Sequence, residues 1–489
     1  MRGLECLDAT RVRAWPVWTL AGTLALAACG GGGGAAPAQT ATLNVSIVGA
    51  GFVTSAPVGI DCNNDCTEPY ALGTAVTLVA HPGAGSAFAG WSGDADCSDG
   101  SVTMSAGRNC TATFTVLVAG SRIMGGLDFS LARGRNGVVS SWGSDATEAL
   151  GNGAGVQGRS APGPTSLTAT IDAVATAPGA SHSLAIERVT GRVWAWGANA
   201  AGQLGDGSQS TRADPVVMRD STSAEVTTAV AVAAGAAHSL VLRADGSVLA
   251  AGLNNNGQLG DNTAQSRDFA APVPNVCGAG IPVTAIAAGA DFSVALCADG
   301  RVRAWGANSD GQLGDGTFAQ SGIPVTVSGL AGHTVTAIAA GDKFALALDS
   351  GGLAWSWGSN TRGQLGTDST VVQRRNVAGT VGGFVGGTAI AAGLEHAVVV
   401  LANGAVFAWG ANDSGQVSPV PGDPSQVDFS FHVVGLPGIV ELAAGRAHSL
   451  AVDATGKVWT WGSNNAGQLG IGTTTSVSTP TQIGGLDLN

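Results

Sequence analysis

The sequence is short of charge, and it offers little from which long solvent-exposed helices are built. Charged residues make up 11% of the 489 residues, whereas glycine alone contributes 76. This composition suits short strands that are joined by tight turns. No helical spacing of apolar residues is visible in the first folded region. The composition therefore predicts an all-β fold.

Common catalytic and phosphate-binding motifs are also missing. There is no His-Glu-x-x-His pair for zinc and no Gly-x-Ser-x-Gly elbow in a strand-to-helix setting. The recurring Gly-Gln-Leu-Gly-Asp-Gly lacks the Lys-Ser/Thr of a phosphate loop. Residues 153–158 fit Gly-x-Gly-x-x-Gly, but no βαβ context surrounds them. We predict no catalytic residue, no metal ligand and no cofactor.

An excess of positive charge is absent as well, since the net charge is −12. That balance argues against a nucleic-acid partner. After the first 28 residues, no segment is apolar enough to span a bilayer. We therefore expect the membrane to be reached through an anchor at the N-terminus only.

The N-terminus has the layout of a secretory signal. Arg2, Arg11 and Arg13 precede an apolar run over 14–28, which is short for a membrane span. Leu26-Ala27-Ala28-Cys29 resembles the bacterial lipobox, in which the cysteine is acylated and becomes the mature N-terminus. We predict a signal peptide over 1–28, lipidation at Cys29 and a flexible glycine-rich tether over 29–40. An ordinary signal peptide or an uncleaved anchor remains the alternative.

The residue after the cysteine bears on the destination. It is Gly30, whereas an aspartate at this place often retains bacterial lipoproteins at the inner membrane. We therefore expect an outer-membrane lipoprotein of the cell envelope, facing the periplasm or the surface. Cys6 lies in the removed segment, and the six cysteines that remain after Cys29 are an even number, which fits an oxidising compartment.

Residues 41–117 read as a small β-rich domain. Stretches 42–45, 76–79 and 111–116 have strand composition, and Gly90-Trp91-Ser92-Gly93 precedes a closing Thr-Ala-Thr-Phe strand. The pattern resembles the internalin B-repeat-like domain of bacterial surface proteins. That resemblance implies a spacer or adhesive module, and no functional residue is carried over from it.

Four cysteines of this domain allow three connectivities. We favour Cys62 with Cys66, which are close enough for a local bridge, and Cys97 with Cys110. Asp61, Asn63 and Asp65 alternate as in a calcium loop, but the cysteines interrupt the run and the glycine expected at the sixth position is missing. A disulfide-closed turn is the better interpretation.

Residues 118–489 carry a repeat. A Trp-Gly pair recurs six times, and Ala251-Gly252 occupies the third place in the series. Successive glycines of these pairs are 52 to 55 residues apart. Gly-Gln-Leu-Gly begins five residues after the pair in five units and is degraded in the first and sixth. The repeated tryptophans are Trp142, Trp196, Trp305, Trp357, Trp409 and Trp461.

Each unit contains the signals of a β-hairpin. Asp245-Gly246 lies between the β-rich runs 237–242 and 247–250, and such a pair supplies the positive φ that a tight hairpin turn needs. Four-stranded sheets of about 50 residues bury both faces only when they stack around an axis. We therefore predict seven blades in a closed ring, with the tryptophans filling the space between neighbouring sheets.

The repeat resembles the regulator of chromosome condensation repeat family. Residues 233–240 (Ala-Ala-Gly-Ala-Ala-His-Ser-Leu) and 193–205, with Trp194-Ala195-Trp196-Gly197 and Gly202-Gln203-Leu204-Gly205, carry the resemblance. It implies a seven-bladed β-propeller with one blade built from both ends of the chain. In that arrangement 121–124 completes the sheet begun by 479–483.

Four histidines occupy one position of the repeat, the third place after its glycine. The other three units have Phe129, Phe292 and Phe344 there. Because phenylalanine neither binds metal nor moves protons, we interpret the position as packing. The histidines are His182, His238, His396 and His448.

The last two cysteines, Cys277 and Cys297, have no repeat equivalent. We expect a disulfide that pins the insertion at 267–280 to the ring. A metal or redox pair is less favoured, because the spacing is not Cys-x-x-Cys.

Function is expected in what does not repeat, namely 212–220, 267–280 and 418–432. Members of the family include a nucleotide-exchange factor that binds chromatin and secreted bacterial inhibitors of β-lactamases. The leading hypothesis is an envelope-tethered, monomeric scaffold that is not an enzyme and binds a protein or glycan. The alternatives are an inhibitor of a periplasmic or secreted enzyme and, third, a polysaccharide-active enzyme.

Overall fold

The computed structural model of the protein describes residues 39–489, except 49–50, 63–64, 83–85, 117–120, 154, 156–157 and 419–424. The expected signal peptide, Cys29 and most of the tether lie outside the described residues. The only helix in the described part is a 3-10 turn, η1 (Ala95–Cys97). None of the described helices is long and apolar enough to cross a membrane.

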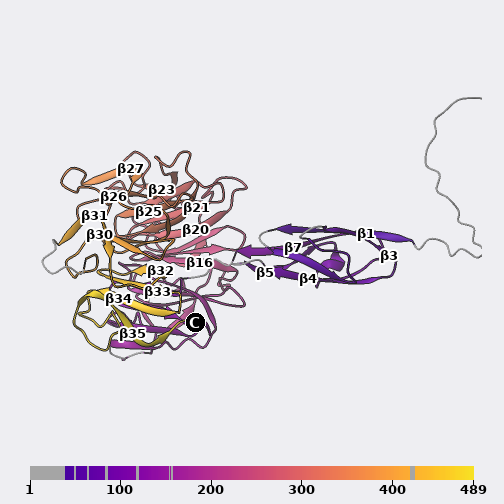
Figure 1. Ribbon diagram of the computed structural model, residues 1–489, viewed down its shortest axis with the longest axis horizontal. Coiled ribbons are helices and arrows are strands. Elements are labelled where there is room, and N and C mark those ends of the chain that lie inside the picture. The colour runs from indigo at the N-terminus through magenta and orange to yellow at the C-terminus, as the bar shows by residue number, and fades with distance from the viewer. Residues whose placement is uncertain are drawn as a thin grey trace, which may run out of the picture. The chain divides into compact units, whose positions relative to one another are not determined.

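The chain divides into two compact units, of which the smaller holds two antiparallel sheets (Figure 1). One sheet has the order β3-β1-β7-β5 and the other has β2-β4-β6. Their strands are β1 (Thr40–Val48), β2 (Gly51–Ala56), β3 (Thr67–Ala71), β4 (Ala75–Pro82), β5 (Ser86–Gly93), β6 (Ser101–Thr103) and β7 (Arg108–Val116). The three strands expected from the sequence are present as β1, β4 and β7.

Disulfides support the small core of this unit. Cys62 is bonded to Cys66, and Cys97 is bonded to Cys110. The backbone of Asp61 exchanges two hydrogen bonds with that of Asp65, of 2.9 and 2.7 Å, which closes the turn between the first two cysteines. Leu43, Val53 and other apolar side chains of alternate strand positions fill the space between the sheets.

The larger unit consists of seven four-stranded antiparallel sheets (Figure 1). Within each blade the strands follow one another in chain order. The first three blades are β8 (Ile123–Gly125), β9 (Phe129–Arg133), β10 (Val139–Gly143) and β11 (Arg159–Pro164); β12 (Ile171–Ala175), β13 (His182–Glu187), β14 (Val193–Gly197) and β15 (Arg212–Val217); and β16 (Ala229–Ala234), β17 (His238–Arg243), β18 (Val248–Gly252) and β19 (Arg267–Pro272).

Blades four to seven repeat this order. They are β20 (Val283–Ala288), β21 (Phe292–Cys297), β22 (Val302–Gly306) and β23 (Ser321–Thr326); β24 (Val335–Ala340), β25 (Phe344–Asp349), β26 (Ala354–Ser359) and β27 (Arg374–Thr380); β28 (Gly387–Ala392), β29 (His396–Leu401), β30 (Val406–Ala411) and β31 (Gln426–Val433); and β32 (Ile439–Ala444), β33 (His448–Asp453), β34 (Lys457–Gly462) and β35 (Val477–Asp487). The fold is the all-β, seven-bladed propeller expected from the repeat.

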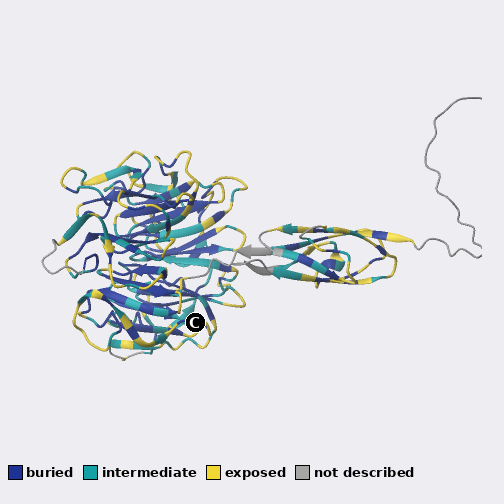
Figure 2. Cartoon of the chain, in the orientation of Figure 1, coloured by how far each residue is buried: buried dark blue, intermediate teal, exposed yellow. Residues whose placement is uncertain are grey.

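The core of the ring lies between neighbouring blades (Figure 2). All six repeated tryptophans are fully buried. The glycine that follows each of them has a positive φ, from 97° to 109°. At Gly306 a Cβ atom would lie 2.6 Å from the carbonyl oxygen of Asp291, so glycine is required there. The Trp-Gly pair therefore combines a side chain that fills the seam with a residue that allows the close approach.

The ring closes differently from the expectation based on family resemblance. Ser121–Met124 does not complete the sheet of Thr479–Ile483, because β8 pairs with β9 and β35 pairs with β34. Each repeat supplies all four strands of its own blade, so no strand is exchanged. Blades seven and one meet through contacts between the blades instead, including the Arg122–Glu441 ion pair at 2.8 Å and the backbone hydrogen bond from Arg446 N–H to the Gly126 carbonyl.

Candidate interaction surface

The two ends of the ring carry different connections. We call the end with the turns between first and second strands, such as 235–237, and the long third-to-fourth connections, such as 253–266, the loop face. The other end carries the hairpins, such as 244–247, and the links between blades, and we call it the hairpin face. The loop face is built to a single plan in nearly every blade.

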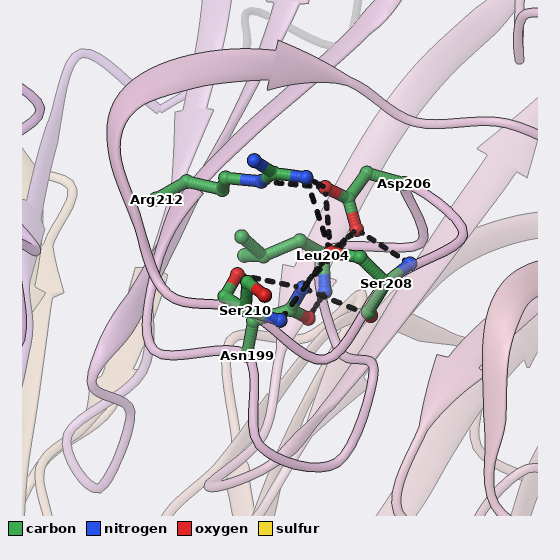
Figure 3. Close-up of polar contacts among 6 residues, drawn as sticks. All are labelled: Asn199, Leu204, Asp206, Ser208, Ser210 and Arg212. Carbon is green, nitrogen blue, oxygen red and sulfur yellow. Dashed lines mark hydrogen bonds and ion pairs between the residues drawn. The ribbon is translucent and has the colours of Figure 1, made fainter.

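One asparagine organises the long connection in six of the seven blades, as Asn199 does in blade two (Figure 3). In blade two, the Asn199 amide donates to the carbonyl oxygens of Ser208 and Ser210, at 3.0 and 3.1 Å. Its oxygen accepts the backbone N–H of Leu204 at 3.0 Å. The side chain is fully buried, so it satisfies backbone groups that would otherwise lie unpaired inside the loop.

Charge pairing closes the same loop (Figure 3). Arg212, at the start of β15, holds the Asp206 carboxylate at 2.7 Å, and Arg267 pairs with Asp261 in blade three. These contacts and hydrogen bonds from Ser208 lower the pKa of Asp206 against the opposing effect of burial. The asparagine recurs at Asn254, Asn308, Asn360, Asn412 and Asn464. In these six blades, the described parts of the connections are therefore held by a shared set of hydrogen bonds.

Backbone hydrogen bonds link the short turns of successive blades. Ala290 N–H donates to the carbonyl of Asp342 at 3.1 Å, and Asp342 N–H donates to Leu394 at 2.9 Å. Further links join Ala236 to Ala290, Leu394 to Gly445, Arg446 to Gly126 and Leu127 to Ala180. This chain of bonds fixes the height and spacing of the turns around the axis.

The four repeat histidines are fully buried, and each is hydrogen-bonded to a serine of the next blade. Ser239 donates to the carbonyl of Gln203 at 2.7 Å, so Nε2 of His182 carries the proton that it shares with this serine. The pairs are His182–Ser239, His238–Ser293, His396–Ser449 and His448–Ser130, at 2.9 to 3.0 Å.

Burial keeps these imidazoles neutral. It lowers the pKa of His182 and His448 to about 3, and that of His238 and His396 to about 4. Their Nδ1 atoms have no hydrogen-bond partner among the described residues. The position packs the seam between blades, as the exchange with phenylalanine predicts, and it also joins the blades by a hydrogen bond.

In the short turns of the loop face, the residues at equivalent positions differ from blade to blade. The two residues after each repeat glycine are Ala236-Ala237 in blade three but Asp342-Lys343 in blade five. Blades four to six present Asp291, Asp342 and Glu395, which we call the acidic sector. The sequence analysis missed these residues, because it considered only the third place after the glycine.

Two of the three carboxylates lack an ion-pair partner among the described residues. Neither Asp342 nor Glu395 forms an ion pair or a side-chain hydrogen bond within the part of the chain that the structure describes. Lys343 pairs instead with Asp310, at 3.8 Å. Burial raises the pKa of Asp342; Lys343 opposes this rise, and the neighbouring carboxylates add to it. The sector is thus a region of negative potential on the loop face.

The stretches whose sequences do not repeat nevertheless contain strands that occur in every blade. Much of 212–220, 267–280 and 418–432 forms the outer strands β15, β19 and β31. A fourth strand is present in every blade, and it lies at the outer edge of its sheet and is partly exposed, so its sequence varies. Residues 273–282 link blades three and four on the hairpin face, and Cys277 in this link is bonded to Cys297 of β21.

A metal site is not evident in the described residues, where no group of three or more His, Cys, Asp or Glu side chains is placed to hold an ion. The backbones of Asp61 and Asp65 are hydrogen-bonded to one another. Asn63 lies outside the described residues.

Comparisons with known families agree with the two-unit architecture. The RCC1-like domain family matches residues 220–489, the regulator of chromosome condensation (RCC1) repeat matches 190–242, and the divergent InlB B-repeat domain matches 52–117. The first of these covers more than half of the chain.

Similar proteins come from several eukaryotes. The chain is 30% identical over 368 residues to the human E3 ubiquitin-protein ligase HERC2, which covers 73% of the chain but only 7% of HERC2. It is 28% identical to the ultraviolet-B receptor UVR8 of Arabidopsis thaliana, covering 75% of the chain and 82% of the receptor. The propeller of yeast RCC1 (Prp20), solved with Kap60, superposes with a TM-score of 0.64 at 24% identity, over 74% of this chain and 87% of that one.

Proposed function

Since the chain belongs to the RCC1-like domain family, we propose that its propeller is an envelope-tethered scaffold that binds a protein partner through the loop face. The proposal rests on the contrast between a loop backbone that is the same from blade to blade and exposed side chains that are not. Buried asparagines and linked turns hold the loop face in one shape, while the residues displayed on it differ from blade to blade. Fixed loops with variable side chains are typical of recognition surfaces.

The acidic sector gives the partner its expected chemistry. Asp342 and Glu395 lie in adjacent turns that are joined by the hydrogen bond from Asp342 N–H to the Leu394 carbonyl. In blades two and three the same places hold alanines and one serine. The partner is therefore expected to lie over blades four to six and to present lysine or arginine side chains, since complementary charge steers association and fixes orientation.

Tethering is supported by the signal-like N-terminus. The apolar run over 14–28 ends at Cys29, and glycines follow it. The three disulfides fit an oxidising compartment outside the cytoplasm. We propose that Cys29 carries the lipid and that the protein is held at the outer membrane.

Partner capture tests the loop face. The full mature chain is immobilised and incubated with envelope extract, and the captured proteins are compared between two charge-matched variants. Asp342→Asn with Glu395→Gln removes two charges from the loop face, whereas Asp220→Asn with Glu225→Gln removes two from the hairpin face. We expect the first pair to weaken capture at least tenfold and the second to leave it unchanged. Equal capture by both variants contradicts the proposal.

Two further measurements, the salt dependence of capture and the stoichiometry of the complex, distinguish the kinds of partner. Capture through the acidic sector falls as salt rises, because exposed charges are screened. If the captured protein is an enzyme that loses activity at one equivalent of this chain, the scaffold acts as an inhibitor. Turnover of a polysaccharide by the isolated chain would replace the scaffold proposal.

Lipidation has its own test. Cells that express the full-length chain are labelled with radioactive palmitate and fractionated. We expect label in the outer-membrane fraction, and we expect Cys29→Ala to lose both the label and the membrane association. Label that persists in the variant excludes Cys29 as the acylated residue.

A further inference from the structure

The long connection of blade one, between β10 and β11, departs from the other six at the residue that organises it. Asp145 stands two residues after the Trp-Gly glycine, where blade two has Asn199. Its Oδ1 atom accepts the backbone N–H of Leu150 at 2.9 Å, just as the Asn199 oxygen accepts a backbone N–H in blade two. The other oxygen, Oδ2, is buried and has no hydrogen-bond partner within the described chain. An ionised carboxylate donates no hydrogen bond, so it cannot hold loop carbonyls as the asparagine amide does.

A second carboxylate in this loop occupies a place where the other six blades have glycine. Glu148 has a φ of 60°, and the equivalent glycines have φ values from 75° to 84°. The Oε2 atom of Glu148 is buried and also lacks a hydrogen-bond partner among the described residues. Burial raises the pKa of Asp145, and the nearby charge of Glu148 adds to the rise. The Leu150 N–H and Arg159 oppose it. The two carboxylates therefore lie close enough to repel one another.

A third oxygen comes from Asn152, which occupies the position of Asp206 in blade two. There the Asn199 amide donates to the Asp206 carboxylate at 3.1 Å (Figure 3), and the same contact recurs in blades three and four at 3.0 and 3.2 Å. Blade one has the carboxylate and the amide exchanged, as Asp145 and Asn152. The oxygen and the nitrogen of the Asn152 amide are both buried, and neither has a hydrogen-bond partner in the part of the chain that the structure describes.

The arginine that balances the carboxylate in blade two has a different role in blade one. Arg212 begins β15 and pairs with Asp206 at 2.7 Å. The equivalent residue, Arg159, begins β11 and donates to the carbonyl and the hydroxyl of Ser141, at 3.0 and 2.8 Å. It also donates to the carbonyls of 163 and 164, at 2.9 Å each. These acceptors are neutral, so two negative charges have been added to the loop while its own cation is bound elsewhere.

We propose that this loop binds a calcium ion through Asp145 Oδ2, Glu148 Oε2 and the amide oxygen of Asn152. Calcium prefers carboxylate and amide oxygens and accepts about six to eight of them in flexible geometry, so water supplies the remaining ligands. The ion takes the place that the asparagine amide and the arginine fill in blade two. With few protein ligands we expect a dissociation constant of about 10⁻⁴–10⁻³ M, as in extracellular modules.

The site is hidden from a reading of motifs. The sequence analysis expected no metal ligand, because the exchange appears only when equivalent loops are compared position by position. Since one of the three ligands is an amide, the site is compatible with the absence of a group of three acidic, His or Cys side chains among the described residues. It lies in blade one, away from the acidic sector of blades four to six, so either proposal can fail without the other.

Terbium luminescence tests the site, because an indole lies beside the loop. A Cβ atom on Gly151 would lie 2.6 Å from Nε1 of Trp196. Tb³⁺ is titrated into the full mature chain after treatment with EDTA, its emission is excited through tryptophan, and CaCl₂ is then added as competitor. We expect a saturable signal that CaCl₂ displaces and that MgCl₂ displaces at least tenfold less well, since Mg²⁺ demands a near-ideal octahedron at shorter distances. Absence of a saturable signal overturns the proposal.

Two charge-matched variants locate the ion. Asp145→Asn with Glu148→Gly restores the residues that the other blades have, so this chain is expected to fold and to bind Tb³⁺ at least tenfold more weakly. Asp220→Asn with Glu225→Gln removes two charges from the hairpin face and should leave binding unchanged. Equal binding by the two variants means that the ion is held by general negative charge and contradicts the assignment. If circular dichroism shows the first variant unfolded, Glu148→Gln replaces it, with the same expected loss.

A gain of affinity provides the opposite test. Asn152→Asp introduces the residue that blades two to four have at this position and adds a third carboxylate to the site. Because affinity for calcium rises with the charge of its ligands, we expect at least tenfold tighter binding of Tb³⁺ and of the CaCl₂ competitor. Unchanged or weaker binding by this variant would exclude the Asn152 side chain as a ligand.

Discussion

The indole nitrogen of Trp142, in the first blade, donates a hydrogen bond of 2.9 Å to the carbonyl oxygen of Gln468, in the last blade. The other five repeated tryptophans make the same donation to the preceding blade, at 2.8 to 2.9 Å. The seam between the two ends of the chain is therefore built like every other seam. The ring is closed by a buried side chain rather than by a shared strand.

Replacement of Trp142 tests this closure. Trp142→Ala removes a fully buried indole, and a loss of about 3–5 kcal/mol in the free energy of unfolding is expected from the cavity. Trp305→Ala, at an internal seam, serves as the comparison and should cost a similar amount. Urea unfolding followed by circular dichroism measures both. A much smaller loss at Trp142 would show that the closing seam carries less of the stability.

Blade three, which lacks the tryptophan, provides a second test. A Cβ atom on Gly205 would lie 2.8 Å from Cγ of Met218 and 3.5 Å from Cβ of Ala251. In the other blades that have the glycine, an indole stands beside it, as Trp305 does at Gly260. Met218 thus fills the space that the missing ring would occupy.

Ala251→Trp is therefore expected to overpack this seam and to lower the free energy of unfolding by about 1–3 kcal/mol. Adding Met218→Ala should recover at least half of that loss, since it empties the space the indole needs. Thermal unfolding of the single and double variants measures the coupling. Additive losses would mean that the two side chains do not compete for one site.

How far the sequence predicts this molecule depends on whether a feature repeats. The Trp-Gly period predicts the number of blades, because each copy must perform the same packing. It does not predict that Leu394 meets Gly179, because that contact depends on one longer turn in blade two. Nor does it reveal the serine that faces each histidine, since the partners lie on different blades and 53 to 57 residues apart, or 318 at the closing seam.

The histidine position is coupled to the residue it faces on the next blade. Histidine faces serine at four seams. Phe292 packs in one cluster with Ala345, and Phe344 packs with Ala397. Phe129 departs from the rule, because the equivalent residue of blade two is Ser183, which donates to the Ala149 carbonyl at 3.1 Å.

A double-mutant cycle tests the coupling. His238→Phe alone should lower the free energy of unfolding, because it removes the hydrogen bond to Ser293. Combined with Ser293→Ala, it reproduces the Phe–Ala seam found elsewhere in the ring. We expect a coupling energy of about 0.5–3 kcal/mol from urea unfolding. A coupling near zero would reduce the pairs to independent packing positions.

The buried histidines also predict a dependence of stability on pH. Their pKa values of about 3 to 4 in the folded chain lie below the unfolded value of about 6.5. Between these limits the unfolded state binds more protons, so stability is fully present above pH 6.5 and is lost as pH falls toward 4. Each histidine contributes up to about 1.4 kcal/mol per pH unit in this window.

Unfolding by guanidinium at pH 7.5 and 5.0 measures the effect and keeps above the range in which most carboxylates titrate. The free energy of unfolding should fall from the first pH to the second. The variant His396→Phe with Ser449→Ala removes one of the four imidazoles and should reduce that difference by roughly 2 kcal/mol, since about 1.5 pH units lie below the unfolded pKa. His432→Phe, which alters a histidine exposed on β31, is the control. If the two variants show the same pH dependence as the unmodified chain, the buried imidazoles are not the source of the acid sensitivity.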